Sequence, residues 1–242
     1  MTITVLAIDG QGNNTLQYLD LLQDTANIFP AEEIKLLTSD INARHGIIEC
    51  IYIPKLDYLG YSQFCIEQLT KYINTDFFLN VQLDGFILNP ELWDNDFLKY
   101  DYIGAPWQNK KSRPLHTNMI VGNGGFSIRS KRLLNTLEKI KWHSDWEKHD
   151  VLKEHWGNED YFICVLIRDI LEAQGIKFAP IDLASRFSVQ SGDPLGRTKI
   201  LKNVFGFHGT GLVGKARRHV EKQGIYYNHL KNIKKSIFPL RY

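Results

Sequence analysis

Short apolar segments alternate with helical segments through residues 1–90, and this alternation limits the chain to a small number of folds. The expected strands are the runs Ile3–Ile8, Ile34–Leu37, Ile47–Ile53 and Phe77–Leu83. The expected helices are residues 13–29, with Leu16, Leu19, Leu22 and Ala26 on one face, and Tyr61–Ile73. This order predicts an α/β protein with a mostly parallel central sheet flanked by helices. Ligands of such sheets bind beyond the carboxyl ends of the strands, which is where Asp9 and Asp84 fall in the sequence.

The second half of the chain has shorter and less regular segments. The expected strands are Tyr100–Ala105, Met119–Val121 and Gly125–Ile128, and the expected helices are Arg132–Ile140 and Asn158–Ala173. Gly175 follows the last helix and is expected to end it. A chain of 242 residues is long enough to bury a core but short for two separate domains, so we expect one compact domain.

The cysteines and the N-terminal segment bear on the cellular compartment. Cys50, Cys65 and Cys164 lie far apart among apolar neighbours and form no Cys-x-x-Cys pair, as expected for reduced core residues. Met1–Ile8 lacks the charged start and long apolar run of a signal peptide, and no segment has the length of a bilayer span. We therefore expect a cytoplasmic protein.

The strongest expected strand runs into the sequence Gln82-Leu83-Asp84-Gly85. Side chains alternate along a strand, so Gln82 and Asp84 are expected on one face, where they offer a neutral and a charged oxygen. Oxygen ligands at a strand end suit the hard divalent cation that a nucleotide diphosphate requires. An Asp-Gly turn that simply closes a strand is the alternative explanation, and it is very common.

A glycine-rich segment, Gly122–Gly125, lies between two short apolar runs. Three glycines in four positions allow a backbone to approach a ligand closely and to expose its N–H groups. Asn-Gly is also the strongest short signal for a hairpin turn, which needs fewer glycines than this segment contains. The segment therefore favours a ligand site, with a hairpin as the alternative.

The sequence Asn158-Glu159-Asp160 opens the long expected helix. A carboxylate at this position could accept a proton from an incoming hydroxyl group. Helix electrostatics alone also favours Asn as the cap and acidic residues in the first turn. Further along the chain, Phe207–Gly211 contains His208, and Lys215 follows. A neutral imidazole can complete the coordination of a cation and a lysine can hold a phosphate oxygen, although a partly buried structural histidine would leave the same pattern.

The order of these four signals resembles the core of the GT-A glycosyltransferases. That family is recognised by an Asp-x-Asp motif, a glycine-rich loop, an x-Glu-Asp motif and a C-terminal histidine. The corresponding segments here are Gln82–Asp84, Gly122–Gly125, Asn158–Asp160 and His208. The intervening Tyr100–Trp107 also looks like a branch of bacterial and viral sugar transferases that has Gln-x-Asp in place of Asp-x-Asp.

The resemblance runs from Ile3 to about Lys215 and implies a GT-A, Rossmann-like single domain. Residues 1–90 would form the nucleotide-binding half, residues 91–200 the acceptor-binding half, and residues 201–242 a basic C-terminal tail. The implied activity is transfer of a sugar from a UDP- or GDP-linked nucleotide-diphosphate sugar to the hydroxyl group of a carbohydrate or glycoconjugate acceptor. The resemblance further implies dependence on Mn²⁺ or Mg²⁺ and inversion at the anomeric carbon.

The resemblance assigns roles in donor binding to several residues. Asp84 and His208 would bind the cation, and Gln82 would lie beside them. Asp9 would contact the base or the ribose, and Lys215 would steady the diphosphate. In many members the first Asp of the motif contacts ribose while the second holds the metal, so Gln82 leaves weak or absent metal dependence open.

The remaining roles concern the transferred sugar and the acceptor. Gly124 and Gly125 would border both. Asp160 would be the catalytic base that takes the proton of the acceptor hydroxyl, and Glu159 would form a hydrogen bond with a sugar hydroxyl.

Two other functions remain compatible with the sequence. A non-catalytic sugar- or nucleotide-binding protein on the same fold is favoured by Gln82, whereas the presence of Asp84, Asp160 and His208 together speaks against it. A metal-dependent phosphohydrolase or nucleotidyltransferase would be built around Asp9 and Asp84, and would leave the Glu-Asp pair unexplained.

The C-terminal part of the chain is strongly basic. From Lys199 onward it has ten Lys and Arg residues and one acid, Glu221. Such a tail could contact a diphosphate, a nucleic acid or an anionic membrane surface. Its aromatic residues, Tyr226, Tyr227 and Phe238, match no recognisable nucleic-acid-binding module, so no nucleic acid is expected as a partner. A peripheral contact of this tail with the inner membrane face is the hypothesis that remains.

Overall fold

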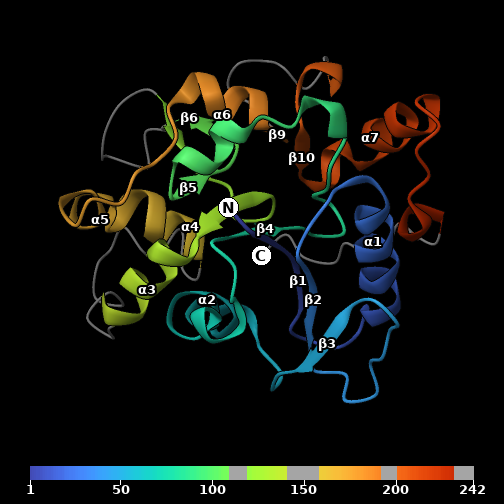
Figure 1. Cartoon of the computed structure of the whole chain (residues 1–242), viewed down its shortest axis with the longest axis horizontal. Coiled ribbons are helices and arrows are strands. Elements are labelled where there is room, and N and C mark those ends of the chain that lie inside the picture. Colours follow the sequence, from blue (N-terminus) through green and yellow to red (C-terminus); the bar gives the residue numbers. More distant parts are fainter. Residues whose placement is uncertain (109–118, 141–157, 192–200, 232–242) are drawn as a thin grey trace.

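A six-stranded sheet forms the centre of the computed structural model, which describes residues 1–108, 119–140, 158–191 and 201–231 (Figure 1). In spatial order its strands are β3 (Glu49–Tyr52), β2 (Glu33–Thr38), β1 (Ile3–Asp9), β4 (Phe77–Asn80), β8 (Ser127–Ser130) and β5 (Tyr102–Ile103). The first four are parallel, and β8 runs antiparallel to both β4 and β5. The mostly parallel sheet expected from the sequence is therefore confirmed.

Helices cover both faces of the sheet (Figure 1). They are α1 (Thr15–Ile28), α2 (Tyr58–Glu67), α3 (Lys131–Ile140), α4 (Glu159–Tyr161), α5 (Arg168–Ala173), α6 (Ile181–Phe187) and α7 (Thr210–Lys222). On β1, Val5 and Ala7 belong to the hydrophobic cluster that contains the inner face of α1. Leu6 and Ile8 belong to the cluster that contains residues of α2 and α3. The two-residue period of the strand thus divides the core into two layers.

Two small sheets and several short helical turns complete the described part of the chain. The small sheets pair β6 (Pro106–Gln108) with β7 (Met119–Val121), and β9 (Ser188–Gln190) with β10 (Gly206–His208). The 3-10 turns are η1 (Leu69–Tyr72), η2 (Pro90–Leu92), η3 (Asn95–Lys99), η8 (Leu201–Asn203) and η9 (Asn228–Lys231). In the part of the chain that the structure describes, no helix is long and apolar enough to cross a membrane.

Several expected elements have different bounds in the structure. The helix expected over Tyr61–Ile73 begins earlier, at Tyr58, and gives way to η1 after Glu67. The single helix expected over Asn158–Ala173 is divided by a π-helical segment, η6 (Phe162–Leu166), between α4 and α5. The extra residue of a π turn shifts the face of α5 relative to that of α4, a change that the hydrophobic pattern of the sequence does not indicate.

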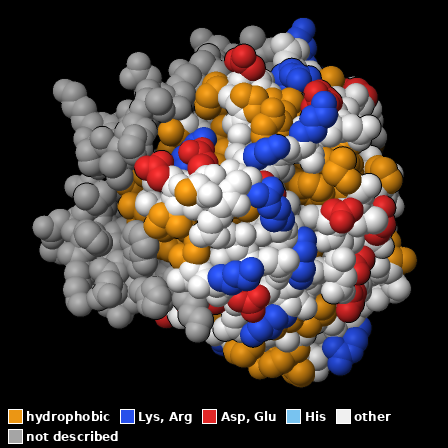
Figure 2. Space-filling model, turned by 60° about the vertical axis from the view of Figure 1, so that its left-hand side comes forward, with side chains coloured by type: hydrophobic (Ala, Val, Ile, Leu, Met, Phe, Trp, Pro, Cys, Tyr) orange, Lys and Arg blue, Asp and Glu red, His pale blue; other side chains and the backbone are white. Residues whose placement is uncertain are grey.

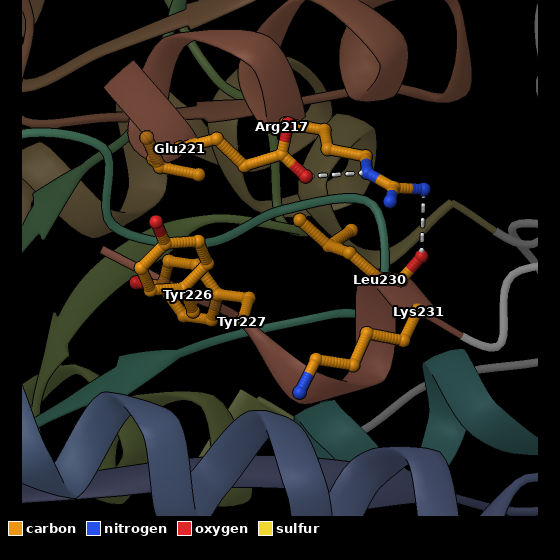
Figure 3. A pocket seen from close by; sticks show the side chains of 7 residues that line it. Arg217, Glu221, Tyr226, Tyr227, Leu230 and Lys231 are labelled. Atoms are coloured by element: carbon orange, nitrogen blue, oxygen red, sulfur yellow. Dashed lines mark hydrogen bonds and ion pairs between the residues drawn. The ribbon is translucent and has the colours of Figure 1, made fainter. Parts of the chain in front are cut away.

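The segment after α7 folds back onto the body of the protein. Arg217 donates from Nε to Glu221 (2.8 Å) and from Nη1 to the carbonyl of Leu230 (3.3 Å), as Figure 3 shows. Tyr227 donates from its hydroxyl to the carbonyl of Ile87 (2.8 Å), and Tyr227 and Leu230 both belong to the main core. Residues 201–231 therefore pack as part of the domain, while the basic residues of 232–242 lie outside the described residues.

Candidate active site

The motif Gln82–Gly85 forms a tight turn at the carboxyl end of β4. The strand ends at Asn80, so the expected strand Phe77–Leu83 is three residues too long. The N–H of Gln82 donates to the carbonyl of Gly85 and the N–H of Gly85 donates to the carbonyl of Gln82, both at 2.8 Å. Alternation along a strand therefore does not place Gln82 and Asp84 on one face; the turn brings both side chains to a third residue.

That third residue is His208, the last residue of β10. Its Nε2 lies 3.2 Å from Oε1 of Gln82 and 3.6 Å from Oδ1 of Asp84. The backbone holds the two segments together as well, because the N–H of Gly209 donates to the carbonyl of Asp84 (2.8 Å). The structure therefore brings the turn and the late histidine, which are far apart in sequence, to one point.

The glycine segment passes directly beside this point. A Cβ atom on Gly125 would lie 2.1 Å from Nε2 of His208, and one on Gly124 would lie 2.1 Å from Oε1 of Glu159. Either contact is far too short, so any side chain at these positions would displace one of the two polar groups. Asn123, with φ of +67°, makes the turn and accepts a hydrogen bond from the N–H of Gly125 (3.2 Å).

The hairpin alternative for this segment is excluded by the strand pairing. β7 pairs with β6, whereas β8 pairs with β4 and β5. Residues 122–126 therefore carry the chain from a small sheet into the central sheet, which explains why this segment needs more glycines than a hairpin does.

The two acids at the start of α4 lie on the other side of the glycine segment. Asp160 accepts a hydrogen bond from the N–H of Gly124 through Oδ2 (2.8 Å). Glu159 is 8% exposed, and its Oε1 is paired with Nη2 of Arg129 (2.8 Å). Burial, and then the charge of Glu159, raise the pKa of Asp160 to about 6. The two neighbouring carboxylates thus differ: Glu159 has an arginine partner, whereas the pKa of Asp160 is raised to about 6.

Asp9 and Lys215 lie in different surroundings. The buried carboxylate of Asp9 accepts hydrogen bonds from the N–H of Gly12 (3.1 Å), the N–H of Asn14 (3.2 Å) and the hydroxyl of Thr15 (3.0 Å). Burial raises its pKa. Lys215 is exposed in the second turn of α7, the helix that begins directly after His208 and Gly209. Contacts of Asp9 and Lys215 with a nucleotide remain predictions.

Two tyrosines near the turn were not anticipated from the sequence. Gln82 donates from Nε2 to the hydroxyl of Tyr61 (3.4 Å), so its amide bridges Tyr61 and His208. Burial first, and then the charges of Asp9 and Asp84, raise the pKa of Tyr18. Both tyrosines lie on helices at positions that the hydrophobic pattern does not single out, so their partners become visible only in the folded chain.

The oxygens and the imidazole at the turn suit one divalent cation. Asp84 offers a carboxylate, Gln82 an amide oxygen and His208 a ring nitrogen, with Nε2 of His208 within 3.6 Å of both oxygens. Carboxylate and amide oxygens with one imidazole form an accepted ligand set for Mn²⁺ or Mg²⁺. Among the described residues, no three His, Cys, Asp or Glu side chains gather in this way, so a cation at this point would need the amide of Gln82 as a further ligand.

A mostly parallel sheet, a turn at the end of its fourth strand, and a glycine segment between a histidine and a carboxylate define a GT-A fold. The chain belongs to the family described as "Protein of unknown function (DUF5672)", which matches residues 53–208. That range includes the turn, the glycine segment, the acidic pair and His208. No curated protein matches the sequence.

Three solved structures are similar to this chain at low sequence identity. A glycosyltransferase involved in the glycosylation of the major capsid of PBCV-1 is 13% identical, with 92% of this chain and 100% of that chain covered and a TM-score of 0.51. The galactosyltransferase LgtC, in complex with donor and acceptor sugar analogs, is 15% identical over 93% of this chain and 95% of its own, with a TM-score of 0.44. The bifunctional IspDF of Campylobacter jejuni is 10% identical over 65% of this chain, with a TM-score of 0.41, and this chain spans only 48% of its length.

Proposed function

We propose that the protein is a glycosyltransferase that moves a sugar from a nucleotide-diphosphate sugar to the hydroxyl group of a carbohydrate or glycoconjugate acceptor. One observation carries this proposal: two polar groups of different chemistry lie on opposite sides of a two-glycine backbone. The Asp84 and His208 side chains are on one side, and the Asp160 carboxylate is on the other. Transfer from a diphosphate needs a cation site near the leaving group and a base near the incoming hydroxyl.

The cation site would be formed by Asp84, His208 and Gln82. Mn²⁺ or Mg²⁺ held there would offset the negative charge of the departing diphosphate. Lys215 would contact the same diphosphate from α7. Asp9, at the end of β1, would contact the base or the ribose of the nucleotide, next to the ring of Tyr18.

The acceptor would be activated by Asp160. Its pKa of about 6 leaves it ionised at neutral pH, yet closer to neutrality than an ordinary carboxylate, which suits a general base. The proton of the acceptor hydroxyl would move to Asp160 as the oxygen attacks the anomeric carbon, with inversion of configuration. Gly124 and Gly125 would leave room for the donor sugar, and Glu159 would lie beside the hydroxyl groups while it is paired with Arg129.

A binding protein without catalysis is the second candidate, and Gln82 favours it. An amide in place of a carboxylate removes one negative charge from the cation site and is expected to weaken cation binding. Under this alternative the protein would bind a nucleotide sugar without turning it over.

The decisive experiment is calorimetric titration of UDP and of GDP, with and without Mn²⁺, into the wild type and into Asp84→Ala. We expect Mn²⁺-dependent binding of one of the two nucleotides, with at least about tenfold weaker binding by the variant. Asp96→Ala is the matched control, because the side chain of Asp96 is 49% exposed and is paired with Lys99 (2.7 Å), away from the turn at Gln82. It should bind like the wild type.

Each other outcome has a definite meaning. Binding that is the same with and without Mn²⁺ would indicate a metal-independent nucleotide site around Gln82 and would contradict the proposed cation site. Absence of binding by either nucleotide would contradict a UDP- or GDP-linked donor. Tight nucleotide binding without release of sugar from a panel of nucleotide sugars, in the presence of simple sugar acceptors, would support the non-catalytic alternative.

A further inference from the structure

Arg129 is a fully buried charged residue on β8, which lies between β4 and the edge strand β5 of the central sheet. Only 1% of its surface is exposed. Its Nη2 contacts Oε1 of Glu159 at 2.8 Å, and its Nε donates to the hydroxyl of Ser127 at 3.2 Å. The guanidinium carbon also lies 5.3 Å from the ring centre of Tyr102. Burying a guanidinium so completely is costly, so its partners indicate what it does for the fold and the site.

One partner group is the carbonyl oxygen of Gly124. It accepts hydrogen bonds from Nδ2 of Asn80 (2.7 Å), from the hydroxyl of Ser127 (3.1 Å) and, at 3.5 Å, from Nη2 of Arg129. The N–H of the same residue donates to Asp160 (2.8 Å). The position of this one peptide segment therefore depends on β4 and β8 on one side and on α4 on the other.

The charges in this cluster do not balance. Two carboxylates, Glu159 and Asp160, lie beside one guanidinium, and Arg129 makes its close ion pair with Glu159. Tyr102, Cys65 and Cys164 also interact with Asp160, and burial raises the pKa of each, so they are neutral near pH 7. The single positive charge of Arg129 thus interacts with two neighbouring carboxylates.

We propose that Arg129 is the positioning residue of this site: it keeps Glu159 as its ionised partner, fixes the Gly124 peptide, and leaves Asp160 as the carboxylate that receives the acceptor proton. The proposal rests on the transferase function proposed above. It assigns to Arg129 the difference in role between Glu159 and Asp160, two adjacent acids that have the same chemistry. Removing the guanidinium should make the two acids share a proton, so that a large part of Asp160 is protonated at neutral pH.

The test reads the ionisation of Asp160 directly, without donor or acceptor. The N–H of Gly124 donates to the Asp160 carboxylate, so its resonance in two-dimensional amide NMR should titrate with that acid. Asp160→Asn, which lacks the ionisation, identifies the resonance by abolishing its titration. We expect the midpoint to rise by about one pH unit or more in Arg129→Gln.

Two further variants separate charge from packing. Arg129→Gln/Glu159→Gln removes the pair as a whole and leaves no unpaired buried charge, so it should fold even if the single variant does not. Its midpoint should lie at or below that of the wild type, because the charge of Glu159 affects Asp160 more strongly than that of Arg129. Arg132→Gln, a loss of an exposed arginine three residues further along, should leave the midpoint unchanged.

A midpoint in folded Arg129→Gln within about 0.3 pH units of the wild type would overturn the proposal, as would a double variant that titrates above the wild type. If no nucleotide sugar is turned over, the proposed function fails while these midpoints still stand, so the two failures can be told apart. If turnover is found, loss of Arg129 should move the pH profile of kcat by the same amount as the Gly124 resonance, which a purely structural role would not do.

Discussion

Replacing Asp160 with Asn should stabilise the protein at alkaline pH while it removes the proposed base. Burial and Glu159 raise the pKa of Asp160 from an ordinary 3.8 to about 6. The folded protein therefore binds more protons than the unfolded chain between these two values, so its free energy of unfolding falls as the pH rises through this window. A pKa raised by about two units lowers the free energy of unfolding by about 3 kcal/mol above pH 6, and roughly half of this loss is present at pH 5.

Asparagine should escape this penalty without losing the main contact. Its amide oxygen can still accept the hydrogen bond from the N–H of Gly124, which Asp160 accepts at 2.8 Å. It carries no charge to be buried beside Glu159. We expect Asp160→Asn to unfold in urea with a free energy about 2–3 kcal/mol higher than the wild type at pH 8, and with a smaller gain at pH 5.

The comparison needs a control in the same part of the chain. Asp169 is exposed in the first turn of α5, so Asp169→Asn should change stability by no more than about 0.5–1 kcal/mol, and in the destabilising direction. If Asp160→Asn is less stable than the wild type at pH 8, or gains the same amount at pH 5 and pH 8, the carboxylate is not held at a raised pKa and the reasoning is wrong.

Two further predictions concern the cation side of the site. Gly125→Ala would place its Cβ 2.1 Å from Nε2 of His208, so we expect loss of Mn²⁺-dependent nucleotide binding and about 1–3 kcal/mol lower stability by urea unfolding. The control is Gly214→Ala at an exposed position of α7, where the nearest atom to the new Cβ would be 3.9 Å away. This variant should keep nucleotide binding and gain up to about 1 kcal/mol in stability. Gln82→Asp adds a carboxylate beside Asp84 and His208, so Mn²⁺ alone should bind about tenfold more tightly by calorimetry, and unchanged affinity would mean that residue 82 does not face the cation.

The central sheet could be predicted because each early segment carries its own signal. The β-branched run that forms β1 and the apolar run that forms β4 were found within a few residues of their bounds. The error at Leu16 is instructive, because it was placed on the apolar face of α1 but is 76% exposed. Its spacing to Leu19 fits a helix, yet Leu16 is the second residue of α1 and its side chain is not covered, and periodicity does not contain that information.

The site could be predicted only as an ordered set of local motifs. The turn at Gln82 and the histidine at position 208 were each recognised, but their 3.2 Å contact depends on how β10 is placed against the end of β4. Arg129 could not be found at all, because its short strand, Ser127–Ser130, carries no pattern that marks a buried charge, and its partner Glu159 lies thirty residues away. A buried ion pair has no local sequence pattern, whereas a turn or a helix start does.

The acidic pair bears on the choice between an enzyme and a binding protein. At position 160 an asparagine would still accept the hydrogen bond from the N–H of Gly124 and would avoid a penalty of about 3 kcal/mol above pH 6, although it would lose the hydrogen bond that Oδ1 of Asp160 accepts from the N–H of Tyr161 (2.7 Å). In a protein that only bound a sugar or a nucleotide, this carboxylate would serve to accept these two backbone hydrogen bonds and nothing more. A general base needs this carboxylate, because the burial that destabilises its charge also raises its proton affinity to the range where it can take a proton from a hydroxyl group. The cost of Asp160 to folding is therefore the strongest argument on the catalytic side, and the pH dependence of stability would measure it before any substrate is known.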